Sequence, residues 1–308
     1  MTTLYLIDAS IYVCRAYFSL PTTLTDAAGA PANALFGYAQ FLCEFLERRN
    51  PSHIAVAFDS SLGQSFRNRL YPPYKANRPE APLDLAYQFE RCRELTRALG
   101  IAGFSSPTHE ADDLIGTLAA RGRAEGFEMM YVSADKDLAQ LVEGRDRLWD
   151  PGRGRLLDAD GVIAEFGVRP AQIVDLLGLA GDAVDNIPGV PGIGRKTAAV
   201  LLAERADMRA IYDDLPSISG LALRGARRVQ ALLEAHAEQA WLSRQLATID
   251  REAPLQATVD QLKWNGVDPQ ALESIGLSGW LARRLARLAP GQAEQGVSLN
   301  VGSPAPAA

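Results

Sequence analysis

Several short apolar runs in this chain end in an acidic residue, and this pattern constrains the fold more than any other feature. The runs and the acids that follow them are 4–7 with Asp8, 53–58 with Asp59, and 128–133 with Asp135 and Asp137. Helical patterns separate the runs, which predicts an α/β fold with a mostly parallel central sheet flanked by helices. In such a sheet, ligands bind outside the carboxyl ends of the strands. We therefore expect these acids to share one crevice.

The strand patterns stop near residue 166, and helical patterns continue from there. We predict an α/β domain over residues 1–165 and a helical region over residues 166–288 that is continuous with it. The last residues, 289–308, are small, polar and rich in proline and glycine, so we expect a disordered tail.

Five groups of acids follow a predicted strand or open a predicted helix. They are Asp8; Asp59; Glu110, Asp112 and Asp113; Asp135 and Asp137; and Asp182 and Asp185. One aspartate in such a place is usually a helix cap or a turn residue. Five groups packed together would repel one another, and proteins offset such repulsion with cations. Ligands that are all oxygen select Mg²⁺ or Mn²⁺ rather than zinc, and nine acids suffice for two ions.

A basic segment, residues 66–82, lies between the second predicted strand and the next helix. It reads FRNRLYPPYKANRPEAP, with four prolines and no apolar period. Its part from 66 to 79 holds four basic residues, three aromatic residues and no acidic ones. We interpret this segment as a mobile excursion from the sheet.

The net charge of −6 argues at first against a polyanionic partner. Without the nine clustered acids, however, the charge would be +3, and bound metal ions would add positive charge locally. The total charge therefore does not exclude DNA. The three cysteines are scattered, which is typical of reduced thiols in a cytoplasmic protein, and no apolar run is long enough to cross a membrane.

The motifs of this chain resemble the 5′ nuclease domain of bacterial DNA polymerase I, in the flap endonuclease superfamily. The resemblance covers roughly residues 3 to 285 and is carried by LIDASIYVCRAYFSLP, AVAFDSS, FRNRLYPPYKANRP, EADDLIGTLA, VSADKDLAQLV and LLGLAGDAVDNIPGVPGIGRKTA. It implies a PIN-like or flap-nuclease-like fold and a 5′→3′ exonuclease and 5′-flap endonuclease that acts by a two-metal-ion mechanism in DNA replication and repair.

The resemblance also implies a role for each acid. The first ion would be held by Asp8, Asp59, Glu110, Asp112 and Asp135. The second would be held by Asp137, Asp182 and Asp185, while Asp113 would join the cluster through water.

Further residues match DNA-contacting positions of the family. The basic segment matches the helical arch, in which Lys75 and Arg78 would contact the scissile phosphate and stabilise charge in the transition state. Tyr74 would stack on a base, as aromatic residues do in single-strand binders. Arg15 matches another phosphate-contacting position.

The glycine-rich stretch at 189–197 is nearly a phosphate-binding P-loop, but Arg195 intervenes and no strand precedes it. The resemblance implies a helix–hairpin–helix element that grips duplex DNA and holds a monovalent cation such as K⁺. Its DNA-contacting residues would be Gly192, Gly194, Arg195, Lys196 and Thr197.

We expect a cytoplasmic monomer that binds flaps, nicks or RNA–DNA hybrids and no membrane. Three alternative functions make different demands on the sequence. A catalytically inactive binder of branched DNA would lack metal ligands, a PIN-type RNase would need neither arch nor hairpin, and an aspartyl phosphatase would need a second acid after Asp8.

Overall fold

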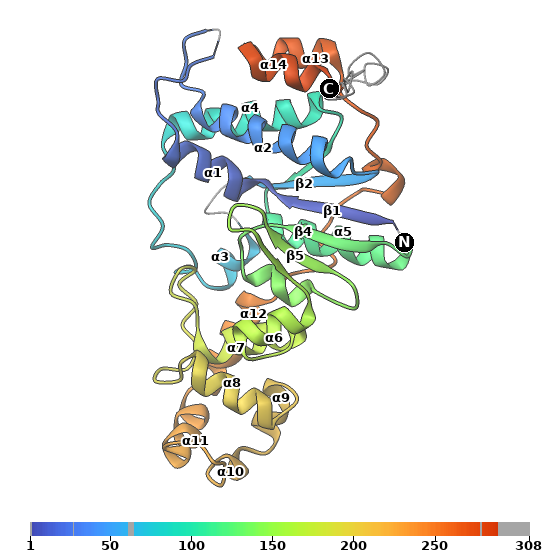
Figure 1. The fold of residues 1–308 in the computed structure, drawn as a ribbon. Helices are drawn as coiled ribbons and strands as arrows, with labels where there is room; N and C mark the ends of the chain where they lie inside the picture. The colour runs from blue at the N-terminus through green and yellow to red at the C-terminus, as the bar shows by residue number, and fades with distance from the viewer. Residues whose placement is uncertain (1, 27, 61–64, 278, 289–308) are drawn as a thin grey trace, which may run out of the picture.

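The computed structural model describes residues 2–26, 28–60, 65–277 and 279–288, so the predicted tail at 289–308 lies outside the described residues. A six-stranded sheet with the order β3-β2-β1-β4-β5-β6 forms the centre of the upper half of the molecule (Figure 1). The strands are β1 (Thr3–Asp8), β2 (His53–Asp59), β3 (Ala102–Ser106), β4 (Glu128–Val132), β5 (Arg147–Asp150) and β6 (Arg155–Leu157). All neighbours pair in parallel except β5 and β6. The predicted, mostly parallel sheet is confirmed.

Helices cover both faces of this sheet. One face carries α1 (Ala9–Ser19), α2 (Asn33–Arg49) and α4 (Leu83–Ala98), and the other carries α5 (Ala111–Ala124). Because strand side chains alternate between faces, Leu4 and Leu6 of β1 pack with α5, whereas Ile7 packs with α1 and α2. Each such side chain is fully buried and contributes about 1.5–3 kcal/mol.

A helical body lies below the sheet in Figure 1. It contains η1 (Asp137–Leu141), α6 (Ala159–Phe166), η2 (Pro170–Gln172), α7 (Ile173–Ala180), α8 (Arg195–Glu204), α9 (Met208–Asp213), α10 (Leu215–Ile218), α11 (Ala226–Ala235) and α12 (Ala237–Ala247). No helix in the described residues is both long and apolar enough to cross a membrane.

After α12 the chain returns to the sheet. The returning segment contains η3 (Val259–Leu262), α13 (Pro269–Ser274) and α14 (Gly279–Ala286). It contacts β2, α4 and α2, and the main-chain N–H of Trp264 donates to the carbonyl of Ser52 at 2.9 Å. The region predicted as helical and DNA-binding, 166–288, is thus not one body, because its last part packs on the sheet.

The order of the strands explains where a ligand would bind. The chain runs outward from β1 through β2 to β3 and then crosses to β4 on the other side of β1. This reversal places a crevice at the carboxyl ends of β1 and β4. Asp8 and Asp59 occupy the last positions of their strands at this edge.

Candidate active site

The first group of acids meets at the carboxyl edge of the sheet. Ser133 Oγ donates to Asp8 Oδ2 at 2.9 Å, and the N–H of Ala111 donates to Asp59 Oδ1 at 2.9 Å. Burial and the negative charges of Asp59 and Asp135 raise the pKa of Asp8 to about 7. Burial, Asp135 and Asp8 likewise hold the pKa of Asp112 well above its usual range. These four predicted ligands are close enough to destabilise one another's charge.

A second group surrounds Lys136. Lys136 Nζ donates to Asp182 Oδ2 at 2.5 Å and lies 3.2 Å from Asp137 Oδ1. That oxygen of Asp137 is buried and accepts no hydrogen bond from the described residues. Burial and the charge of Asp135 raise the pKa of Asp137 to about 7. The loop after α7 therefore brings Asp182 to the acids that follow β4, although 45 residues separate Asp137 from Asp182 in the sequence.

The basic segment contributes two cations to the same site. Lys75 Nζ donates to Glu110 Oε1 at 2.8 Å and lies 3.6 Å from Asp185 Oδ2. Arg78 Nη2 donates to Asp185 Oδ1 at 2.6 Å. Burial alone would raise the pKa of Asp185, but Lys75 and Arg78 hold it below its usual value. The predicted arch cations thus neutralise two of the predicted metal ligands.

Main-chain contacts fix this segment against the loop that carries Asp182 and Asp185. Asn77 Nδ2 donates to the carbonyl of Ala183 at 2.9 Å, and Asn186 Nδ2 donates to the carbonyl of Pro73 at 2.7 Å. The N–H of Lys75 donates to the carbonyl of Asp185 at 3.0 Å. The prediction of a mobile excursion is therefore wrong for residues 73–78. The segment predicted as a helical arch contains one short helix before α4, namely α3 (Phe66–Leu70), and turns follow this helix.

The prediction for Tyr74 is also wrong. Its side chain is 3% exposed, and its hydroxyl donates to Glu110 Oε2 at 3.0 Å. A buried ring cannot stack on a base, so Tyr74 instead holds Glu110 in place.

Asp113 has a partner other than a metal ion. It is fully buried and accepts two hydrogen bonds of 2.7 Å from the guanidinium of Arg67. Arg67 also donates to the carbonyls of Leu246 and Thr248. Both of its oxygens are engaged by this pairing, and its membership in the metal cluster through water stays a prediction. The pair joins α3, α5 and the end of α12 beneath the site.

The glycine-rich stretch connects α7 to α8 at the lower side of the site. Gly194 precedes the first residue of α8, and Gly192 has a φ of +86°, which favours glycine. Arg195 and Lys196 are exposed and Thr197 is half-buried. These residues form a surface apart from the acids, and their contact with DNA remains a prediction.

Arg15 lies on α1 with its Nη2 atom 3.8 Å from Asp150 Oδ1. Sequence reasoning did not identify Asp150, Arg67, Asn77 or Asn186. A signal for Asp150 was present, because this acid follows the apolar pair Leu148 and Trp149 and precedes a Pro-Gly turn.

The chemistry of the donors fits divalent cations. In the part of the chain that the structure describes, no three acidic, histidine or cysteine side chains converge on a single point. Lysine and arginine already neutralise Glu110, Asp182 and Asp185. The remaining acids include two with pKa values near 7, and Asp137 keeps a buried oxygen without a hydrogen bond. Hard cations would stabilise such oxygens in their charged form.

Comparisons with known proteins show the family of this chain. Residues 3–167 match the family model of the 5′-3′ exonuclease N-terminal resolvase-like domain, and residues 168–270 match that of the 5′-3′ exonuclease C-terminal SAM fold. The chain is 43% identical over 260 residues to DNA polymerase I of Pseudomonas aeruginosa, a match that covers 84% of this chain and 28% of that protein. It spans less than a third of the length of the DNA polymerase I relatives it matches.

Solved structures share the fold. The T5 5′-exonuclease with bound divalent metal ions (zinc) has a TM-score of 0.67 at 17% identity, covering 93% of this chain and 99% of that one. A pseudo-enzyme-product complex of the bacteriophage T5 flap endonuclease with DNA and metal ions has a TM-score of 0.66 at 21% identity, covering 89% and 100%. The fold of this chain is of the flap-nuclease-like class. It belongs to the 5′-3′ exonuclease family, and the predicted resemblance is confirmed.

Proposed function

We propose that this protein is a structure-selective 5′ nuclease that hydrolyses DNA phosphodiester bonds with two Mg²⁺ or Mn²⁺ ions. The observation that carries the proposal is the crowding of oxygen-only ligands at the carboxyl edge of the sheet, directly beside Lys75 and Arg78. Acids and cations around one crevice suit a reaction in which metal ions and positive side chains meet a phosphate.

We divide the ligands into two sets, as the resemblance to the family implies. The first ion would be held by Asp8, Asp59, Glu110, Asp112 and Asp135, and the second by Asp137, Asp182 and Asp185. When bound, such ions stabilise charge on the phosphate oxygens and lower the pKa of a coordinated water. Glu110 and Asp185 would then exchange their bonds to Lys75 and Arg78 for bonds to metal, and both cations would be released to face the scissile phosphate.

The glycine-rich stretch would hold the duplex part of the substrate. Exposed Arg195 and Lys196 flank main-chain N–H groups at the start of α8, an arrangement that suits a backbone phosphate. We extend the proposal to a K⁺ ion on the carbonyls of this stretch and to RNA–DNA hybrids as substrates. The inactive-binder alternative has no support in the site, because every acid predicted as a ligand is present.

A comparison of substrates tests the proposed function. We expect a 5′-flap duplex in Mg²⁺ to be cut near the junction at least tenfold faster than an unbranched duplex with the same sequence. Mapping the 5′-labelled products at nucleotide resolution locates the cut. Equal rates on the two substrates, or cuts scattered along the duplex, would contradict structure selectivity.

Replacement of Lys75 or Arg78 by Ala should lower the rate of cleavage far more than the affinity for DNA. The reason is that both cations lie among the acids of the reaction site rather than on the duplex surface. We expect each variant to lose about 100-fold in single-turnover rate, by analogy with the loss of one group that stabilises transition-state charge. Equal losses in rate and affinity would mark the cations as uniform binders instead.

Lys196→Ala is the matched control, since it removes one exposed cation outside the cluster of acids. It should weaken duplex binding and lower the salt dependence by about one phosphate contact. Its rate at saturating protein should stay close to that of the unchanged protein.

A further inference from the structure

A further acid stands at the carboxyl edge of the sheet, outside the predicted metal cluster. Asp150 is the last residue of β5, which runs parallel to β4. Its side chain is fully buried, and its Oδ2 atom accepts no hydrogen bond from the described residues. Its Oδ1 atom accepts from the N–H of Gly152 at 3.0 Å, which fixes the turn that follows. A buried carboxylate with an unpaired oxygen is costly, so it needs cations nearby.

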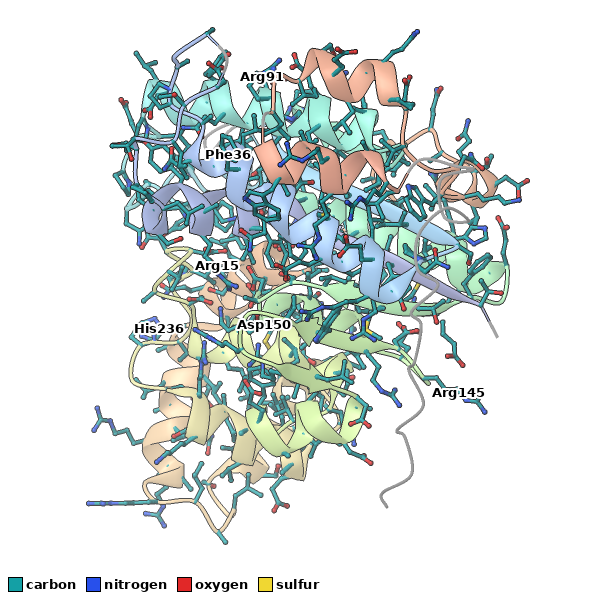
Figure 2. The ribbon with its side chains drawn as sticks, turned by 45° about the horizontal axis from the view of Figure 1, so that its top comes forward. Arg15, Phe36, Arg91, Arg145, Asp150 and His236 are labelled. Carbon is teal, nitrogen blue, oxygen red and sulfur yellow. The ribbon has the colours of Figure 1, made fainter. Side chains whose placement is uncertain are left out.

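Two guanidiniums supply that charge without donating a hydrogen bond to the carboxylate, although the main-chain N–H of Arg153 donates to Asp150 Oδ1 at 3.3 Å. Arg15 Nη2 lies 3.8 Å from Asp150 Oδ1, and Arg153 Nε lies 3.9 Å from Asp150 Oδ2. The two side chains are 42% and 71% exposed, whereas the carboxylate between them is buried. Figure 2 shows Arg15 and Asp150 close together, where α1 meets the turn after β5.

These arginines differ from the other cations around the site. Lys75, Arg78 and Lys136 each donate a hydrogen bond of 2.5–2.8 Å to a predicted metal ligand. The guanidiniums of Arg15 and Arg153 lie 3.8 and 3.9 Å from the carboxylate of Asp150, so their N–H groups remain able to donate to another acceptor. A guanidinium carries five donors in a planar fork that matches the oxygens of a phosphate.

We infer that Arg15 and Arg153 form a two-arginine clamp for a backbone phosphate of the DNA, and that Asp150 is the positioning residue that holds both. The inference rests on the proposed function and extends its substrate contacts to the β5 side of the crevice. Arg15 was expected to meet a phosphate, whereas Arg153 and Asp150 are new to the site.

The turn after β5 provides a test that leaves every charge unchanged. A Cβ atom built at Gly152 would lie 2.0 Å from Arg15 Nη1, so Gly152→Ala forces this guanidinium to move. Gly152 is not among the glycines with positive φ, so the backbone accepts alanine. We expect Gly152→Ala to weaken binding of a 5′-flap duplex about 3- to 10-fold, with an unchanged melting temperature.

Arg153→Ala should weaken binding by a similar factor and reduce the slope of log affinity against log salt by about 0.9. Affinities are measured in Ca²⁺ over a range of salt concentrations. Arg145→Ala is the matched control, because Arg145 is 74% exposed, pairs with Glu128 and lies well away from Arg15 and Asp150 (Figure 2). For Arg145→Ala, the slope of log affinity against log salt should change by much less. Equal slopes for the two variants would overturn the clamp.

Asp150→Asn distinguishes the positioning of the two arginines by Asp150 from the effect of its negative charge on DNA binding. Removal of a negative charge near a phosphate should by itself tighten binding. If Asp150 positions the arginines, the variant should instead bind about 3-fold more weakly, since both guanidiniums lose their anchor. Tighter binding would refute the positioning role.

Failure of the clamp and failure of the proposed function are distinguishable. A protein that cuts the flap in Mg²⁺ but binds DNA equally well with Arg153→Ala refutes only the clamp. A protein that cuts neither flapped nor unbranched DNA refutes the proposed function, whatever these affinities are.

Discussion

Cleavage of a 5′-flap duplex is expected to stop completely when divalent ions are removed with EDTA, and to return when Mg²⁺ or Mn²⁺ is added back. The described acids at the carboxyl edge offer oxygen ligands only, and burial and mutual repulsion already raise the pKa of Asp8 and Asp137 to about 7. Hard cations would stabilise the charged form of these acids and supply positive charge to the phosphate.

Ca²⁺ provides the control for metal removal. It also binds oxygen ligands but takes longer and looser coordination, so it should support DNA binding with little cleavage. The measurement is single-turnover cleavage of a labelled flap in each ion, beside binding by fluorescence anisotropy. Full activity after exhaustive EDTA treatment would refute the proposed metal dependence.

Replacement of both Asp182 and Asp185 by Asn is expected to lower cleavage by at least about 1,000-fold while the fold stays intact, a loss of roughly 4 kcal/mol in transition-state stabilisation. Both residues lie in the loop after α7. Lys136 joins Asp182 to Asp137, which follows β4. Lys75 joins Asp185 to Glu110 at the start of α5, and Arg78 also pairs with Asp185. Asparagine keeps an oxygen that can accept from the N–H of Val184, so the local turn survives. DNA binding should be unchanged or slightly tighter, because negative charge is removed near a phosphate.

A structural role for these two acids predicts a different outcome, which is a loss of about 1–2 kcal/mol in stability with specific activity retained. Asp207→Asn is the matched control, because Asp207 caps α9 by accepting from the N–H of Ala210 at 2.8 Å, far from the acids. Melting temperature and flap cleavage are measured on one preparation of each variant. A weakened double variant that still cuts would assign Asp182 and Asp185 to the fold alone.

The sheet was predictable from the sequence wherever a strand carries a strong apolar pattern. The runs at 4–7, 53–58 and 128–133 agree with β1, β2 and β4 to within one residue. In contrast, β3 has the sequence AGFSS, which lacks β-branched residues, and β6 has only three residues. Their pairing depends on neighbouring strands, and local sequence does not report such tertiary support.

The differences between the predicted and the observed site have a common cause, which is that the sequence shows residue type but not the direction of a side chain. Asp112 and Asp113 are adjacent on α5, where successive side chains point about 100° apart, so only one of them faces the crevice. Asp112 does, and Asp113 turns inward to Arg67. The prediction that Tyr74 stacks on a base follows from its place in a basic segment, yet its ring is buried beneath Lys75.

The path of the chain through the helical body has a consequence for how this family can vary. The chain leaves the sheet at β6 and returns along α5, where the N–H of Asp250 donates to Asp113 and that of Ala253 donates to Thr117. For the entropy of closing the chain, the segment between β6 and Asp250 is one long loop whose two ends are fixed. The entropy of closing such a loop changes by only about 0.6 kcal/mol when its length doubles. Insertions in the connections beside α9 and α10 therefore change this closure entropy little, whereas deletions of these helices would remove the buried Met208, Ile211 and Ile218 from the core.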